Sequence, residues 1–298
     1  MNIGLATFEN ISPALACIYS LPRSGSTVLI TELDRLKGIV CLPESYFPQI
    51  LELLSPDELS DPSRLAAFFL ASSPSGSLLS FEEAQACMVP ADHAKTLVRL
   101  GLACALKTNR EPSQVAIVIW KTTRIVSRWK LFAEAGGRFL VLRRNPLNVF
   151  ESQFRVDFGY YNRNPLRFAA FQESYEAIFS RLPIDITYSV DYESIPEQLT
   201  AIQSWLGVGA EHWIGGESSM AKTHAKEAWH SGLMDGFQSH DSMKRQNIST
   251  RQRLLLKAGQ SMAKPIRPIL VLLRDYYDRQ IMKQIRIAAD EILLKESR

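Results

Sequence analysis

A stretch near the start of the chain combines residue types that bind phosphate. In "CIYSLPRSGSTVLITEL", residues 17–33, an apolar run ends at a Pro, then Arg23 and a turn of small residues, and a helix-like pattern follows. A strand, a turn and a helix in that order aim backbone N–H groups and a helix N-terminus at one spot. The stretch therefore predicts an anion site, unless it is a plain strand-to-helix turn in which Gly25 only permits an unusual φ.

The turn differs from the Walker A loop that binds nucleoside triphosphates. The matching positions are Ser20, Gly25, Ser26 and Thr27, so Ser26 stands where the phosphate-binding Lys belongs. Arg23 lies earlier in the turn and could bridge a phosphate and the group attached to it. The N–H groups of Ser24, Gly25, Ser26 and Thr27, with the Thr27 hydroxyl, would hold the phosphate itself.

A second stretch, "RFLVLRRNPLNVFESQF", places two arginines where a strand ends. Asn145 is a good N-cap and Pro146 a good first helical residue, so a helix should begin there. Ser152 follows seven residues after the cap and so lies on the same helix face. Arg144 and Ser152 could therefore hold one anion together, although a surface Arg and a solvated Ser are also compatible with the pattern.

Together, "PRSGSTVL" and "RRNPLNVFES" resemble the PAPS-dependent sulfotransferases, which move a sulfonate group from 3′-phosphoadenosine 5′-phosphosulfate (PAPS) to an acceptor. The first motif is similar to the family's 5′-phosphosulfate loop and the second to its 3′-phosphate motif, with Arg144 and Ser152 eight residues apart. The doubled Arg before Asn resembles the bacterial branch that includes the nodulation-factor sulfotransferases. The resemblance covers about Ala14 to about Val208.

The resemblance also implies catalytic residues. In "VIWKTTRIV", Lys121 corresponds to the family's strand-end Lys, a cation that would stabilise charge on the departing oxygen. The small-phenol branch has its catalytic His two residues later, where this chain has Thr123. Glu44, in "IVCLPESYFPQI", occupies the place of the catalytic Glu of the tyrosylprotein and carbohydrate branches. With Pro43 and Ser45 beside it, Glu44 could instead be an ordinary helix-start carboxylate.

Two weaker similarities concern the nucleotide. "YSVDYESIPEQLTAIQSWLGV" is similar to the family segment whose Tyr lies against the adenine, which implies this role for Tyr192, although a Tyr there could simply be core or rim. The polar, basic stretch 218–232 would suit a cover over the nucleotide. Lys222 or His224 would then contact a phosphate, and the alternative is a solvated loop.

The order of the elements predicts a P-loop-like α/β fold with three layers, a central parallel sheet and a helical insertion. Short apolar runs without alternation are typical of parallel strands covered on both faces, and helical patterns separate them. The predicted strands are 14–20, 115–120, 138–143 and 184–189, and the predicted helices are 26–37, 146–158, 165–182, 195–206 closed by Gly207, and 265–296.

Residues 1–298 are predicted to form a single domain. The span 55–112 has Ser/Pro-rich turns between short helical pieces and reads as a helical insertion, well placed to cover the acceptor because ligands bind at the carboxyl ends of parallel strands. Residues 209–298 would supply a loop and helices. The aromatic stretch "FRVDFGYYNRNPLRF" could shape an acceptor pocket, or its rings could be core.

Composition narrows the class of protein. Of 298 residues 46% are hydrophobic and 22% charged, typical of a globular chain, and a formal charge of +3 is too small to indicate nucleic-acid binding. Four cysteines, in no metal or disulfide pattern, indicate a reduced protein of the cytoplasm. The chain begins without a secretory pattern and has no apolar run of membrane-spanning length. The five histidines have no metal-ligand spacing, so no metal is predicted.

The sequence therefore predicts an enzyme that transfers a sulfonate from PAPS, releasing 3′-phosphoadenosine 5′-phosphate (PAP), to a hydroxyl of a carbohydrate, glycolipid or small metabolite. Arg23, Lys121 and Glu44 are the predicted catalytic residues. A nucleoside or small-molecule kinase is an alternative, disfavoured by Ser26 in place of Lys. A protein that binds the nucleotide without chemistry is another. The acceptor's identity and the oligomeric state are not indicated.

Overall fold

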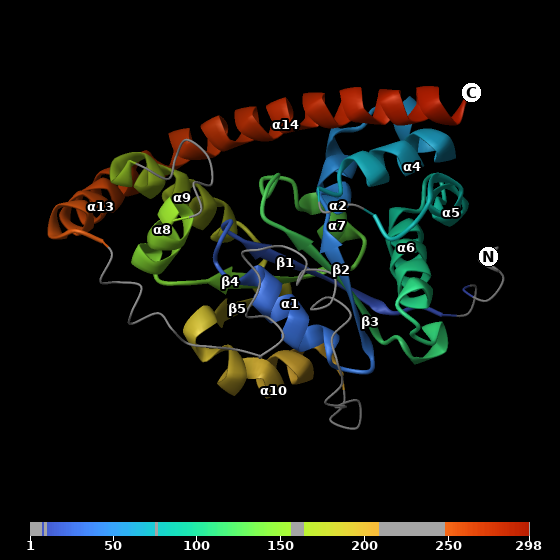
Figure 1. Cartoon of the computed structure of the whole chain (residues 1–298), viewed down its shortest axis with the longest axis horizontal. Coiled ribbons are helices and arrows are strands. Elements are labelled where there is room, and N and C mark those ends of the chain that lie inside the picture. Colours follow the sequence, from blue (N-terminus) through green and yellow to red (C-terminus); the bar gives the residue numbers. More distant parts are fainter. Residues whose placement is uncertain (1–7, 9–10, 75–76, 156–163, 209–247, 298) are drawn as a thin grey trace.

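The computed structural model describes residues 8, 11–74, 77–155, 164–208 and 248–297. Within these residues, five parallel strands form one sheet in the order β2-β3-β1-β4-β5 (Figure 1). The strands are β1 (Ala14–Ser20), β2 (Ile39–Glu44), β3 (Ile117–Thr122), β4 (Arg138–Arg143) and β5 (Thr187–Asp191). The predicted α/β fold with a central parallel sheet is confirmed. The strand order reverses beside β1, where open parallel sheets bind ligands.

Helices cover both faces of the sheet, so the fold has three layers (Figure 1). Successive side chains of a strand point to opposite faces, and β1 accordingly sends Cys17 and Tyr19 into one buried cluster and Ala16 and Ile18 into the other. The helices α1 (Ser26–Asp34) and α10 (Ile195–Leu206) cover the second face. The first face is covered by α2 (Phe47–Ile50), α6 (His93–Lys107), α7 (Lys130–Glu134), α9 (Pro165–Phe179) and parts of further helices.

The predicted start of α8 (Pro146–Arg155) and the predicted end of α10 are confirmed. The Asn145 side-chain oxygen accepts a hydrogen bond from the Leu147 N–H at 3.0 Å, as an N-cap residue does. Gly207 ends α10 with φ +81, the left-handed conformation that glycine adopts without strain. The predicted strand 184–189 begins later, because residues 184–186 form a 3-10 turn before β5.

The span 55–112 is helical, as predicted. It contains α3 (Pro56–Ser60), α4 (Pro62–Ala71), α5 (Phe81–Cys87) and α6. Of these, α6 packs directly on the sheet, with Gly101 so near Val118 that an added Cβ would lie 2.3 Å from a methyl carbon. Within this span α6 is therefore the crossover helix between β2 and β3, and the extra elements are α3 to α5. Three-residue 3-10 turns fill connections at 51–53, 112–114, 192–194 and 264–266.

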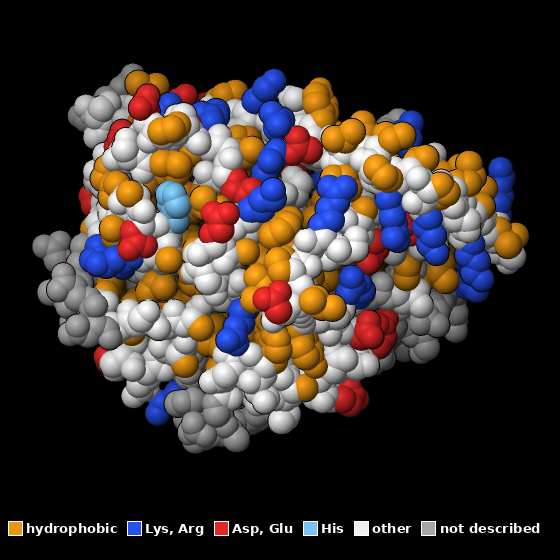
Figure 2. Space-filling view, turned by 180° about the vertical axis from the view of Figure 1, so that it is seen from behind, with side chains coloured by type: hydrophobic (Ala, Val, Ile, Leu, Met, Phe, Trp, Pro, Cys, Tyr) orange, Lys and Arg blue, Asp and Glu red, His pale blue; other side chains and the backbone are white. Residues whose placement is uncertain are grey.

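Two helices end the described chain, α13 (Thr250–Ala263) and the 30-residue α14 (Arg267–Glu296). The sequence pattern predicted the second and not the first. Ser249 and Gln252 start α13 with a capping box, a signal that was present in the sequence. Hydrophobic and basic side chains gather where α13 and the start of α14 lie (Figure 2). None of the described helices has the length and apolar character to span a bilayer.

Candidate active site

The loop between β1 and α1 has the geometry of an anion-binding turn. Gly25 is the N-cap of α1 with φ +92, and its lack of a side chain leaves the first N–H groups of the helix without a side-chain acceptor. The first turn of α1 contains no acidic residue. Arg23 also has a positive φ, +71, which is unusual for a residue with a side chain. Such backbone strain is stored most often at functional sites.

Gly25 is required for a second reason, its contact with Tyr192. A Cβ at Gly25 would lie 2.1 Å from a carbon of the Tyr192 ring. The Arg144 guanidinium lies over the same ring, 4.0 Å from its centroid. Tyr192 is only 5% exposed, so its ring supports the loop and Arg144. Stacking of Tyr192 on adenine stays a prediction.

The turn between β4 and α8 lies against this loop. The Arg23 Nε donates to the Ser152 hydroxyl at 3.4 Å, and an Arg144 Nη donates to the Arg23 carbonyl at 3.3 Å. Gln153, which sequence reasoning missed, donates its amide to the Pro22 carbonyl at 2.8 Å and is 1% exposed. The two stretches that were predicted to hold opposite ends of one nucleotide therefore meet at one edge of the sheet.

Arg143 points away from this edge. Its Nε lies 3.1 Å from a Glu176 carboxylate oxygen on α9, and an Nη donates to the Ser189 hydroxyl on β5. Neighbouring residues at a strand end face opposite sides, so Arg144 lies at the loop between β1 and α1 and Arg143 lies on the opposite side of the strand. Arg144 alone of the pair faces the candidate site.

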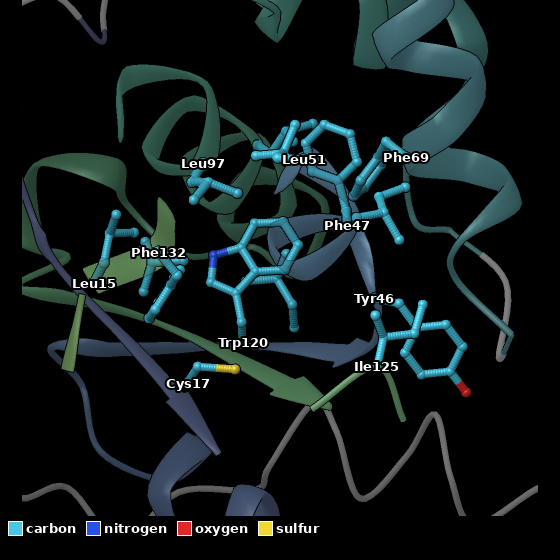
Figure 3. Close-up of a cluster of buried hydrophobic side chains, with 14 of the residues drawn as sticks. Leu15, Cys17, Tyr46, Phe47, Leu51, Phe69, Leu97, Trp120, Ile125 and Phe132 are labelled. Carbon is cyan, nitrogen blue, oxygen red and sulfur yellow. The ribbon is translucent and has the colours of Figure 1, made fainter. Parts of the chain in front are cut away.

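A buried cation, Lys121, lies at the end of β3, on the same edge of the sheet as the anion loop. Trp120 is fixed in the core beside Phe47 and Phe69, with ring centroids 6.5 and 6.3 Å away (Figure 3). The next residue, Lys121, is 3% exposed, and its Nζ donates to the Thr27 hydroxyl oxygen at 3.0 Å. The Lys121 ammonium therefore contacts the first turn of the helix that follows the anion loop.

Lys121 also lies beside the predicted base. Glu44 and Lys121 are register partners on adjacent strands, and the Lys121 Nζ is 3.8 Å from Glu44 Oε2. The other oxygen, Oε1, accepts hydrogen bonds from the Thr123 hydroxyl and, at 3.1 Å, from the Tyr46 hydroxyl. Burial, followed by the nearby Glu44 charge, raises the pKa of Tyr46 far above its usual range, so Tyr46 remains a neutral donor.

Sequence reasoning named Thr123 only as a missing His and did not predict Tyr46. A signal was available for Thr123, which lies two residues after Lys121 at a strand end, where alternate residues share a face. Tyr46 follows the end of β2 as the N-cap residue of α2, with φ −96 and ψ 4, so alternation along a strand does not place it. The two hydroxyls fix the orientation of the Glu44 carboxylate.

The loop after β3 is held by side chains from α9 and α14. The Tyr175 hydroxyl donates to the Thr123 carbonyl at 2.6 Å, and Ser127 donates to Asp278 through its N–H at 3.2 Å and its hydroxyl at 2.5 Å. Arg274 lies over the Tyr175 ring at 4.7 Å and pairs with Asp278 at 2.9 Å. These contacts connect the C-terminal helix to the residue that orients Glu44.

The same loop contains a strained residue, Ile125, with φ +52. A β-branched side chain rarely adopts this conformation, which costs about 1–3 kcal/mol. Ile125 is fully buried in the cluster around Trp120 (Figure 3). Burial of the Ile125 side chain and the hydrogen bonds from Tyr175 and to Asp278 compensate for this cost. The strained residue belongs to the loop in which Thr123 donates its hydroxyl to Glu44.

Other predicted features contribute less. The four cysteines are buried and unpaired with one another, and burial raises the pKa of the Cys104 thiol far above its usual range. Among the described residues, no cluster of three or more His, Cys, Asp or Glu side chains could hold a metal ion. Lys222, His224 and the rest of 218–232 lie outside the described residues, as do residues 156–163 of the aromatic stretch.

No family model and no curated protein matches the chain. Among solved structures, it is similar to the sulfotransferase domain of the Synechococcus PCC 7002 olefin synthase, with 19% identity, a TM-score of 0.41 and coverage of 84% of this chain and 96% of that one. The chain is also similar to the sulfotransferase domain from the curacin biosynthetic pathway, with 14% identity, a TM-score of 0.42 and coverage of 83% of this chain and 97% of that one. A third similar structure is mouse sulfotransferase SULT7A1 complexed with PAP, with 13% identity, a TM-score of 0.38 and coverage of 92% of this chain and 91% of that one.

Proposed function

We propose that this chain is a sulfotransferase that moves a sulfonate group from PAPS to a hydroxyl of a carbohydrate, glycolipid or small-metabolite acceptor. One observation carries the assignment. At a single sheet edge, a helix-capping anion loop joined to Arg144 and Ser152 lies beside the buried Lys121 and its partly exposed partner Glu44. Two anion-binding turns that share Arg23 suit a nucleotide with phosphate at both ends of its ribose.

The groups present fit the phosphosulfate end of the donor. The N–H groups of Ser24 to Thr27 and the uncapped start of α1 supply donors and a positive dipole end for an anion. The Thr27 hydroxyl oxygen accepts from Lys121, which leaves its own O–H available to donate. Ser26 replaces the Lys of a triphosphate loop, consistent with a donor that lacks a γ-phosphate.

The 3′-phosphate is assigned to Arg144 and Ser152. Arg144 is half-buried, oriented by the Tyr192 ring and by the Arg23 carbonyl, so its position is fixed before a ligand binds. Ser152 is 4% exposed and accepts from Arg23. Pre-orientation lowers the entropy that binding must lose, which favours tight recognition of a phosphate.

PAPS supplies the sulfonate and a phosphate oxygen as the leaving group. Glu44 takes the proton of the acceptor hydroxyl as the new bond between acceptor oxygen and sulfur forms. Lys121 stabilises the charge that develops on the bridging oxygen as its bond to sulfur breaks, and Arg23 balances charge on the transferring group. Thr123 and Tyr46 occupy Oε1 of Glu44, so Oε2 is the oxygen assigned to receive the proton.

The decisive test compares two adjacent arginines by isothermal titration calorimetry with PAP. Arg144→Ala should weaken PAP binding by about 10- to 100-fold, since a hydrogen-bonded charge contributes about 1.5–3 kcal/mol. Arg143→Ala is the matched control, because Arg143 binds Glu176 and Ser189 instead, and it should change PAP affinity less than about threefold. Tighter binding of ATP with Mg²⁺ than of PAP by the unaltered protein would reject the assignment in favour of a kinase.

A further inference from the structure

The first half of α14 is apolar on two opposite faces, and the rest of the described chain covers only one. Leu270, Val271 and the Arg274–Asp278 pair are buried on the side that packs on α9. On the opposite side, large side chains are exposed: Ile269 at 57%, Leu272 at 70%, Leu273 at 50% and Tyr276 at 58%. A helix that is hydrophobic all round is normally buried all round, so this face has the composition of an interface.

A seven-residue repeat runs along the outer side of the helix from Ile266, the N-cap residue of α14, to Leu294. Ile266, Leu273, Gln280, Ile287 and Leu294 are spaced by seven residues, and the four apolar members are 44–62% exposed. Seven residues are close to two helical turns, so these side chains follow one stripe. Such a stripe is what a second helix packs against, and a single polar member, here Gln280, is known to set the register of paired helices.

The stripe is symmetrical about Gln280. One leucine or isoleucine lies seven residues away on each side, and another lies fourteen residues away on each side. A partner helix with the same sequence, run antiparallel about an axis at Gln280, would place Leu273 against the partner's Ile287 and Ile266 against the partner's Leu294. A self-complementary surface of this kind is the requirement for an isologous two-fold interface.

We propose that a second copy of this chain covers this face, with the two α14 helices antiparallel and a two-fold axis at Gln280. Figure 1 shows α14 along one edge of the molecule, and no other helix or strand of the described residues lies on its outer side. Its 30 residues extend for about 45 Å, enough length for a dimer contact. The inference does not depend on the proposed function.

Charge also favours a second copy over a lipid surface. The antiparallel register brings Lys264, at the start of the stripe, to the partner's Glu296 at its end. The outer side of the second half carries exposed Lys283 and Glu291, so both signs of charge lie beside Ile287 and Leu294. The acidic Glu291 on this face disfavours an anionic bilayer, whereas the antiparallel register places one Lys264–Glu296 charge pair at each end of the contact.

The first experiment measures mass in solution by sedimentation. The unaltered protein should be a dimer at micromolar concentration, and Leu273→Lys should weaken dimerisation by at least about 10-fold, because two apolar contacts per dimer are lost. The matched control is Leu254→Lys on α13, a leucine outside the stripe that is 63% exposed, against 50% for Leu273. It should leave the dimer unchanged. Circular dichroism would verify that both variants remain folded.

The second experiment tests the axis by disulfide trapping. Gln280→Cys should form a covalent dimer rapidly under mild oxidation, because the two copies of this position meet at the axis. Leu273→Cys or Ile287→Cys alone should not, since equivalent positions would lie about 21 Å apart, but a mixture of the two should cross-link. The four native cysteines are buried and should contribute little background. Ser113→Cys introduces an exposed cysteine far from α14 in the sequence, and it measures the rate of non-specific cross-linking between molecules.

Three results would overturn the inference. One is a monomer at all concentrations up to about 100 μM, a limit above which a contact of this size is not specific. Another is Gln280→Cys cross-linking no faster than Ser113→Cys. The third is a monomer that binds phosphatidylglycerol vesicles and loses this binding in Leu273→Lys, which would assign the face to a membrane surface.

Discussion

Glu44 is surrounded by groups that hold it in one position. Thr123 and Tyr46 donate to one carboxylate oxygen and Lys121 lies 3.8 Å from the other. A general base must be oriented toward the proton that it takes, and an acid–base contribution is worth roughly 10²–10⁴-fold in rate. Buried hydroxyl donors supply that orientation without adding a charge of their own.

Replacing Glu44, the proposed base, should therefore affect turnover and leave donor binding intact. Glu44→Gln keeps the shape and the acceptor oxygen for Thr123 and Tyr46, and kcat should fall by about 10²–10⁴-fold. The measurement is single-turnover transfer of labelled sulfonate, with PAP affinity determined in parallel. Near-normal turnover with normal PAP affinity would remove Glu44 from the catalytic role.

Thr123 is expected to act through Glu44. Thr123→Val removes the hydroxyl that donates to Glu44 and should lower kcat by about 3- to 10-fold, the value of one hydrogen bond, with little change in the KM for PAPS. Thr123→Ser keeps a hydroxyl and should restore most of the rate. If valine and serine variants were equally slow, the effect would come from packing of the methyl group.

Local sequence was sufficient to predict which charged residues reach the sheet edge, because strand ends and motif spacing are local properties. It was not sufficient to predict their partners. Alternation shows that Arg143 and Arg144 face opposite sides, but only the packing of α9 and β5 decides that Arg143 binds Glu176 and Ser189. Gln153 likewise contacts Pro22 across 131 positions of sequence.

At the scale of elements, the loop before α1 depends on a glycine for two separate reasons. Gly25→Ala should destabilise the fold by about 2 kcal/mol or more, because φ is +92 and the new methyl would overlap the Tyr192 ring. PAP binding should fall strongly, since the loop must shift. Urea unfolding and calorimetry measure the two effects.

A substitution at Gly136 distinguishes the cost of a positive φ from the cost of the contact with Tyr192. Gly136 also has a positive φ, +80, but an added Cβ there meets nothing within 4 Å. Gly136→Ala should thus show only the conformational cost, about 1 kcal/mol, with unchanged PAP affinity. Equal losses of stability and of PAP binding in the two variants would show that the Tyr192 contact is unimportant.

Element types were predictable where one signal dominated the local sequence. The Asn145 cap and Gly207 determined their helix ends, and apolar runs indicated four of the five described strands, with β2 not among the predicted ones. The helix α13 was missed because its pattern contains exposed Leu254 and Met262, at 63% and 70%, on the side away from the core. A periodicity that places apolar residues on both sides does not indicate a single buried face.

At the scale of the whole molecule, α14 links the extra helices to the rest of the fold. Arg286 pairs with Glu58 on α3 and donates to the Leu53 carbonyl at 2.9 Å, while Arg64 on α4 lies 2.9 Å from Asp290. Toward its other end, α14 packs on α9 and holds the loop after β3 through Asp278. One helix therefore supports both the predicted acceptor cover and the loop that orients Glu44.

The Glu58–Arg286 contact should make stability depend on pH. Burial raises the pKa of the Glu58 carboxyl, but the Ser55 N–H and the Arg286 guanidinium outweigh it and hold that pKa below its ordinary value of 4.5. A carboxylate with a lowered pKa contributes stability above its unfolded pKa and loses it as the pH falls through the folded value. Glu58→Gln keeps an oxygen that can accept from the Ser55 N–H of the capping box and replaces the charged oxygen that accepts from Arg286 by a neutral NH2 group.

Near pH 7, Glu58→Gln should reduce the free energy of unfolding by about 1 kcal/mol, a modest value because Arg286 is partly exposed. The difference from the unaltered protein should shrink as the pH falls below 4.5, where Glu58 becomes protonated. Urea unfolding at a series of pH values measures it, with Glu197→Gln on the exposed first turn of α10 as the control. A difference that stayed constant or grew in acid would mean that the Glu58 charge does not hold α14 to the extra helices.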